Sequence, residues 1–211
     1  MEKTKKSYFN IVGGVIFIIL ALLNIFLFLH YLRYGGMWWR FLISIIAYIT
    51  ISIPLFLRSK KLWPILVGFI LLSICQLIYC IIGTIRYLDP PKFMGSNTGI
   101  NSPAFVAHLT TNLFAIGANI FAVVITILTF KEDTRRKEKI KKLWFVPTIL
   151  SVLSIVIILI FSAIKVYILN GVFIFLQFTY VFYIVGILFA MMWIAYPNGF
   201  NKNPVESLEK I

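Results

Sequence analysis

The side chains that could carry out chemistry in this sequence are few, and most of them are neutral. The chain has two histidines, two cysteines and seven acidic residues. A hydrolytic metal site needs about three protein ligands, and an aspartyl-type site needs two carboxylates. The sequence holds no HExxH, CxxC, glycine-rich phosphate loop or G-x-S-x-G turn. We therefore predict no catalytic residues, no cofactor and no metal, and we rank an enzyme below the non-catalytic classes.

The remaining polar side chains recur at helical intervals. In the stretch 104–130, small or polar residues lie three and four positions apart, which places them on one face of a helix. An amide that faces lipid without a partner costs free energy, so this face is expected to point inward. It comprises His108, Asn112, Ala115, Asn119, Ala122, Thr126 and Thr129.

A candidate ligand site follows from these polar positions. Most of its members fall in the middle or the outer half of their predicted spans, with His30, Arg33 and Arg86 just above them. This asymmetry predicts a polar cavity that opens to the outside, with a cationic rim. Two alternatives stay open, because polar seams also pack membrane helices and Lys165 can snorkel to the interface. The candidate ligand-binding residues are Asn24, Gln76, His108, Asn112, Asn119, Lys165 and Gln177.

The elements that must position these residues are predicted to be transmembrane helices. Hydrophobic residues make up 61% of the 211 residues, only 13% are charged, and the mean hydropathy is +0.96. The apolar residues form blocks of about 20, the length that crosses a hydrocarbon core. We predict an all-α, polytopic bundle that is a single integral membrane domain over residues 1–211. Its six spans are expected at 9–31, 41–57, 62–85, 104–130, 143–165 and 172–196.

The distribution of basic residues predicts the orientation. Segments on the side of the termini hold fifteen lysines and arginines, against five on the other side. The positive-inside rule therefore places both termini in the cytoplasm and the loop 86–103 outside. The cytoplasmic segments are then 1–8, the basic loop 131–142 and the tail 197–211. Seven cations in Lys131–Lys142 are expected to meet anionic lipids of the inner leaflet, so the net charge of +13 does not indicate nucleic acid.

Two functional hypotheses fit this architecture. The first is a transport or ligand-capture protein of a plasma membrane, prokaryotic by composition, whose cavity takes a small anionic or zwitterionic molecule or a lipid headgroup. The size, six spans and outward-open polarity are similar to those of the substrate-binding subunits of vitamin-type uptake systems, which implies a membrane or ATPase partner subunit. The second is an interaction protein, such as an immunity, sensor-accessory or assembly factor, that acts through its loops and has a solid core.

Overall fold

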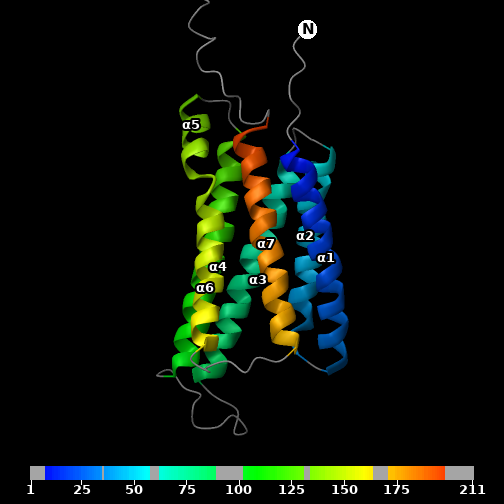
Figure 1. Ribbon diagram of the computed structural model, residues 1–211, viewed down its shortest axis with the longest axis vertical. Helices are drawn as coiled ribbons and strands as arrows, with labels where there is room; N and C mark the ends of the chain where they lie inside the picture. Colours follow the sequence, from blue (N-terminus) through cyan, green and yellow to red (C-terminus); the bar gives the residue numbers. More distant parts are fainter. Residues whose placement is uncertain are drawn as a thin grey trace, which may run out of the picture.

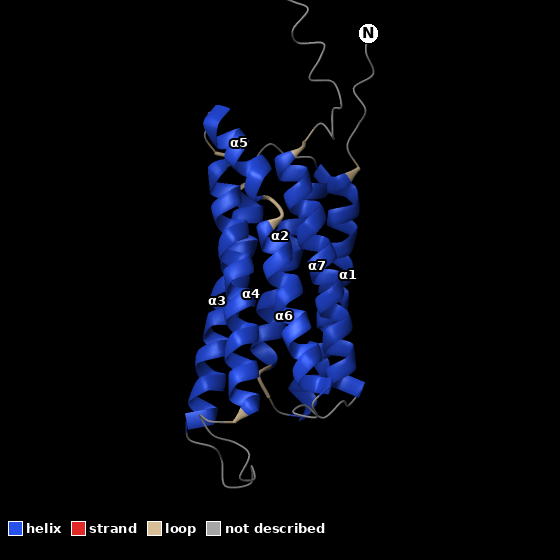
Figure 2. Cartoon of the chain, turned by 60° about the vertical axis from the view of Figure 1, so that its left-hand side comes forward, coloured by secondary structure: helices blue, strands red, loops and turns tan. Residues whose placement is uncertain are grey.

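The computed structural model describes residues 8–34, 36–57, 62–88, 102–130, 134–163 and 171–197. Figure 2 shows that these residues are almost entirely helical, with no strand in the described part of the chain. The helices are α1 (Phe9–Tyr34), α2 (Trp38–Leu57), α3 (Trp63–Leu88), α4 (Pro103–Leu128), α5 (Thr134–Leu143), α6 (Val146–Ala163) and α7 (Gly171–Ala195).

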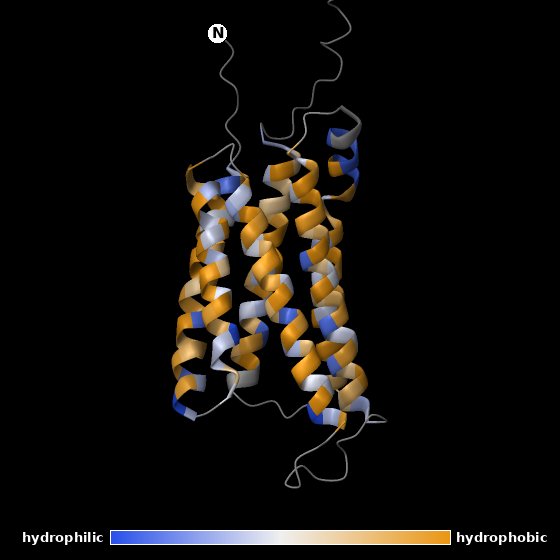
Figure 3. Ribbon diagram, turned by 180° about the vertical axis from the view of Figure 1, so that it is seen from behind, coloured by the Kyte–Doolittle hydropathy of each residue, from blue (hydrophilic) through white to orange (hydrophobic). Residues whose placement is uncertain are grey.

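Six helical segments in the described part are long and apolar enough to cross a membrane. They are Phe9–Tyr34, Trp38–Leu57, Trp63–Leu88, Pro103–Leu128, Lys137–Ala163 and Ile174–Ala195. The hydrophobic colour runs along the outside of these helices in Figure 3, as expected for surfaces that face acyl chains. The predicted all-α, six-span membrane fold is confirmed.

The spanning helices run alternately up and down and close into a ring. Consecutive neighbours around the ring are α1, α2, α3, α4, α6 and α7, and α7 returns to α1. Figure 1 places the start of α1 and the end of α7 at the same end of the bundle. We refer to this as the amino end, and to the opposite end, where α2 and α4 begin, as the distal end.

Helix boundaries differ from the predicted spans by a few residues, and one difference matters. The sequence predicted a turn up to Arg40, but α2 begins at Trp38, so Arg40 lies inside its first turn. At the same end, the Ser102 hydroxyl caps α4 by accepting a hydrogen bond from the Phe105 N–H, and Pro103 occupies the first turn. The early start of α2 turns a predicted surface cation into a residue of the bundle interior.

The basic stretch 131–142, predicted as a loop, is largely helical. Helix α5 covers Thr134–Leu143 and stands at the amino end in Figure 1, with residues 131–133 outside the described part. Lysine, arginine and glutamate are good helix formers, and Lys142 pairs with Glu138 one turn before it at 3.4 Å. Ile140 is only 4% exposed and joins the apolar core, which anchors an otherwise solvated helix.

The amino half of the bundle is filled by apolar side chains. Phe17 and Phe69 are fully buried and meet edge to face, with ring centres 6.4 Å apart. Helices α2 and α3 approach closely at Gly68, where a Cβ atom would lie 2.9 Å from the Ala47 carbonyl oxygen. Glycine is required at that contact, because any side chain would push the two backbones apart. The amino half is therefore the closely packed region of the bundle.

Candidate functional site

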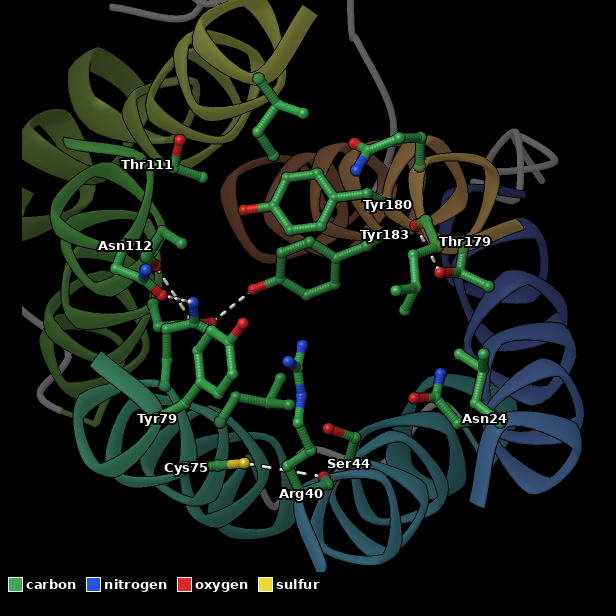
Figure 4. A pocket seen from close by; sticks show the side chains of 18 of the residues that line it. Asn24, Arg40, Ser44, Cys75, Tyr79, Thr111, Asn112, Thr179, Tyr180 and Tyr183 are labelled. Carbon is green, nitrogen blue, oxygen red and sulfur yellow. Dashed lines mark hydrogen bonds between the residues drawn. The ribbon is translucent and has the colours of Figure 1, made fainter. Parts of the chain in front are cut away.

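The distal half of the bundle encloses a pocket of about 310 Å³. All six spanning helices contribute to its wall, and Figure 4 shows their side chains converging on a central space. The volume falls in the range of small-molecule sites, which begins at roughly 300 Å³. Its lining mixes amides, hydroxyls and tyrosine rings with a single arginine. The bundle is therefore not solid throughout its length.

The structure brings six of the seven candidate site residues to this one pocket. Residue Lys165 lies outside the described residues. Because the six come from four different helices, the pocket is a meeting point of separate polar faces. They are Asn24, Gln76, His108, Asn112, Asn119 and Gln177.

One wall of the pocket is a continuous chain of hydrogen bonds between α3 and α4. The Gln76 Nε2 donates to Asn112 Oδ1 at 2.6 Å. The Asn112 Nδ2 lies 3.2 Å from His108 Nδ1 and donates to the His108 carbonyl oxygen at 2.6 Å. The His108 Nε2 in turn lies 3.3 Å from the Cys80 carbonyl oxygen. These side chains fix one another, so the wall is ordered without a ligand.

The deepest part of the pocket is closed by tyrosine. The Tyr183 hydroxyl donates a hydrogen bond to Asn119 Oδ1, drawn in Figure 4. Its ring packs 6.2 Å from that of Tyr48, which in turn contacts Phe17 in the apolar core. Below this floor the side chains are the apolar ones of the amino half. Tyr183 and Tyr48 therefore lie between the pocket and the apolar core of the amino half.

Arg40 lines the pocket and was not among the candidate residues from the sequence. Figure 4 shows its guanidinium reaching from α2 toward the centre of the pocket. The Cζ atom lies 4.0 Å from the centre of the Tyr79 ring, and the Cys75 thiol donates to the Arg40 carbonyl oxygen at 3.6 Å. Stacking on an aromatic face leaves the N–H edge of a guanidinium free to bind an anion.

The charge of Arg40 has no counterpart among the described residues. The only carboxylate in the described part of the chain is Glu138, which lies in α5 at the amino end. The part of the chain that the structure describes also holds no group of three histidine, cysteine or acidic side chains that could bind a metal. Among the described residues, Arg40 is therefore the one charged side chain in the lining of this pocket.

Tyrosines are the second feature that sequence reasoning left out of the site. Five of them line the pocket, together with Ser44, Thr111 and Thr179. Their helical spacing was a usable signal, since Tyr79 follows Gln76 and Cys75 at intervals of three and four on α3. The tyrosines are Tyr48, Tyr79, Tyr87, Tyr180 and Tyr183.

Two polar atoms of the wall are buried without a hydrogen-bond partner. These are Thr111 Oγ1 on α4 and Gln177 Oε1 on α7. By contrast, Tyr180 donates to Ser154 Oγ at 3.1 Å, and Ser154 donates to the Thr111 carbonyl oxygen at 3.1 Å. Buried polar atoms usually have a hydrogen-bond partner. An unpaired hydroxyl and an unpaired amide oxygen in a pocket wall therefore favour a site that binds a polar ligand or water.

A second, shallower cavity of about 460 Å³ lies at the distal end. Its wall includes Arg86, and it shares four residues with the deeper pocket: Arg40, Tyr79, Tyr87 and His108. The Tyr87 ring packs 5.5 Å from the His108 ring, so the shared residues form a partition. The two cavities are therefore neighbours that share these side chains, and Arg86 lies in the wall of the distal one.

Comparison with family models, with curated proteins and with solved structures gives no match for this chain. The function has to be inferred from the pocket itself.

Proposed function

We propose that this protein captures a small anionic molecule in its distal pocket. The single observation that carries the proposal is Arg40, a cation held inside the bundle with no carboxylate among the described residues to neutralise it. Arg40 is half-buried in the pocket wall, and an anionic ligand would pair with its charge through charge-assisted hydrogen bonds. The amide and hydroxyl groups around it supply orientation and specificity.

An anion is a better ligand for this pocket than a zwitterion. An ammonium group needs carboxylate or several carbonyl acceptors, and the described lining offers only the amide oxygens and the tyrosine rings. Both a free anion and the phosphate of a lipid headgroup share the chemistry that Arg40 recognises. Titration with both kinds of probe distinguishes a free anion from a lipid headgroup.

The proposed direction of capture is from outside the cell. The positive-inside rule places the amino end, with the basic helix α5, in the cytoplasm and the distal pocket outside. The packed amino half closes the pocket from below, which supports capture and would correspond to an outward-open state if the protein transports its ligand. The alternative, an interaction protein with a solid core, is disfavoured by the pocket.

The proposal is tested by titration calorimetry of the purified protein in a neutral detergent. The probes are benzoate, benzenesulfonate and inorganic phosphate as free anions, phenylalanine as a zwitterion, and dihexanoylphosphatidylglycerol as a headgroup. We expect an anion to bind and phenylalanine to bind weakly. Binding of the lipid alone assigns the headgroup, whereas binding of a free anion assigns a soluble ligand. If none of the five probes binds, the proposal fails.

The variant Arg40→Gln tests the residue that carries the proposal. Truncating one partner of a buried charge pair costs about 2 kcal/mol or more, so we expect at least about a 30-fold loss of affinity. Arg33→Gln is the matched control. Arg33 also lies at the distal end, and its Cζ atom is 5.5 Å from the centre of the Tyr34 ring, but it lines neither cavity. Equal effects of the two variants would contradict the proposal.

A further inference from the structure

His108 is held in the neutral form by its two neighbours. Its Nε2 lies 3.3 Å from the Cys80 carbonyl oxygen, which can only accept, so Nε2 carries the hydrogen. Its Nδ1 lies 3.2 Å from the Asn112 amide nitrogen, which can only donate, so Nδ1 accepts. The ring lies against Gly83, where a Cβ atom would come within 2.2 Å of His108 Cε1. Any other residue at position 83 would displace the imidazole.

The donors in this wall all point in one direction, from Gln76 through Asn112 and His108 to the Cys80 carbonyl oxygen. Gln76 stands at the start of the chain and lines the pocket. One hydrogen of its Nε2 is committed to Asn112, at 2.6 Å, so the amide keeps its second N–H and the Oε1 acceptor for a ligand. In this state Gln76 presents one donor and one acceptor.

Protonation of His108 would reverse the chain. A hydrogen on Nδ1 would face the Asn112 amide nitrogen, another donor, so the Asn112 amide has to turn over and present Oδ1 to the imidazole. That turn gives up the bond from Asn112 to the His108 carbonyl oxygen and presents an N–H to Gln76. Gln76 then turns as well, accepts that N–H with its Oε1 and leaves both hydrogens of its Nε2 free. The result is one more donor hydrogen and a new positive charge where an anion would bind.

The groups around His108 oppose this step until a ligand arrives. Arg40 from α2 and Arg86 from α3 share cavity walls with His108, and both are cations. From α3 the Tyr79 and Tyr87 rings also face it, with ring centres at 5.8 and 5.5 Å, together with the Cys80 carbonyl group. None of these groups is a carboxylate. A bound anion would reverse the sign of the local field and favour the third cation.

We propose that His108 is a proton-binding site linked to the anion pocket, so that the protein takes up one proton together with its anion. The inference rests on the proposed anion capture and adds a second ligand to it. Linkage is reciprocal: if the anion favours the protonated imidazole, protonation must raise the affinity for the anion by the same factor. The complex of a monoanion would then gain no net charge.

The chain offers a clean test because His108 and His30 are its only histidines. His30 packs against Tyr31 and Tyr34 and lines neither cavity, so His30→Gln is the matched control for His108→Gln. The probe is benzenesulfonate, whose charge is constant, titrated at about pH 5.5 and about pH 8, a range in which histidine is the side chain that ordinarily titrates. Calorimetry in two buffers of different ionisation enthalpy counts the protons taken up.

We expect wild type and His30→Gln to bind benzenesulfonate at least about fivefold more tightly at the lower pH, with proton uptake, and His108→Gln to lose both properties. Affinity that does not depend on pH in the wild type overturns the inference and leaves anion capture standing. Retention of the pH dependence by His108→Gln overturns it as well. Absence of binding by all five probes of the first experiment, at both pH values, defeats the proposed function and this inference with it.

Two further measurements keep the inference testable if His108→Gln does not fold. The histidine NMR signals of the wild type, assigned with His30→Gln, should show that the probe shifts the His108 titration to higher pH. An unmoved titration overturns the linkage. Gln76→Met, which fills the same space without hydrogen-bonding groups, should reduce the pH-dependent gain in affinity. A full gain in that variant overturns the amide reversal.

Discussion

Helix α3 passes through two regions that use similar positions in opposite ways. At the amino half, Phe69 is fully buried against Phe17. Farther along the same helix, Gln76 and Tyr79 line the pocket and contact polar groups of α4 and α2. The amino half is packed by shape, whereas the distal half is held by a few directed contacts around open space.

The polar groups of the two halves differ in the same way. In the amino half, Thr126 donates to the Ala122 carbonyl oxygen and Ser151 to the Pro147 carbonyl oxygen, so each is satisfied within its own helix. In the distal half, Gln76 bonds to Asn112 on the neighbouring helix, and Gln177 Oε1 has no partner. The amino half also holds the unpaired Thr148 Oγ1 at the start of α6 and Asn10, which donates to the Leu55 carbonyl oxygen of α2. Bonds between helices are common in membrane-helix packing, so the feature that distinguishes the distal half is its pocket.

The largest expected effect breaks the packed half. Phe69→Ala removes a fully buried ring, and we expect a loss of about 3–5 kcal/mol in the free energy of unfolding, because the surrounding helices collapse only in part. Reversible unfolding in mixed detergent micelles measures it. Leu77→Ala, at a position that is 48% exposed, is the control and should lose much less. Equal losses would mean that the amino half is not the stabilising region.

A smaller effect concerns how accessible each half is to thiol reagents. In a cysteine-free background, Ser44→Cys places a thiol in the pocket wall and Ser52→Cys places one in the packed half of the same helix, where Ser52 is 1% exposed. We expect the first to react with an anionic methanethiosulfonate roughly tenfold faster than with a cationic one, because Arg40 attracts the anion. The second should not react. Faster labelling by the cationic reagent would contradict the anion pocket.

The floor between the halves gives the next effect. Tyr183→Phe removes the hydroxyl bonded to Asn119 and leaves a buried amide oxygen without a partner, at a cost of about 1–3 kcal/mol in unfolding free energy. Tyr180→Phe is the comparison, since Ser154 keeps its bond to the Thr111 carbonyl oxygen when the Tyr180 hydroxyl is lost. If Tyr180→Phe proves the more damaging change, the floor is not where the structure places it.

The six spans and the inward face of α4 could be predicted because each depends on one helix alone. A block of about 20 apolar residues specifies a span, and polar residues three and four apart, such as His108 and Asn112, specify a face. Arg40 could not be placed in this way. Beside two tryptophans it has the pattern of an interfacial turn, and its inward direction depends on the start of α2 at Trp38 and on the Tyr79 ring of another helix.

The helix within the basic stretch 131–142 was not predicted, for a different reason. Its charges indicated a segment outside the membrane, and a segment between two spans is commonly a loop. Helix formation over Thr134–Leu143 is favoured by local propensity, but its anchoring depends on Ile140, one apolar residue among cations. Ile140 can be buried only because α4 and α7 lie beside α5, which the local sequence does not indicate.

The smallest predicted effect compares two buried asparagines on α1, one in each half. Asn10 donates to the Leu55 carbonyl oxygen of α2 at 2.9 Å, whereas Asn24 donates to the Leu20 carbonyl oxygen of its own helix at 2.8 Å and lines the pocket. Interhelical bonds in membranes contribute about 0.6 kcal/mol on average, so Asn10→Leu should lose about that much unfolding free energy. Asn24→Leu should lose almost none, because the Leu20 carbonyl oxygen keeps its helical hydrogen bond.

For ligand affinity the ranking should be reversed, with Asn24→Leu the more damaging of the two variants. Asn24→Leu exchanges a pocket amide for an apolar group and should weaken anion binding, while Asn10→Leu acts about 20 Å along the helix and should leave it unchanged. Unfolding in detergent and calorimetry with benzenesulfonate, made on the same preparations, give both quantities. A variant pair that changed stability and affinity in parallel would show that the halves are not independent. The crossed result is expected because one asparagine joins two helices and the other faces the space between six.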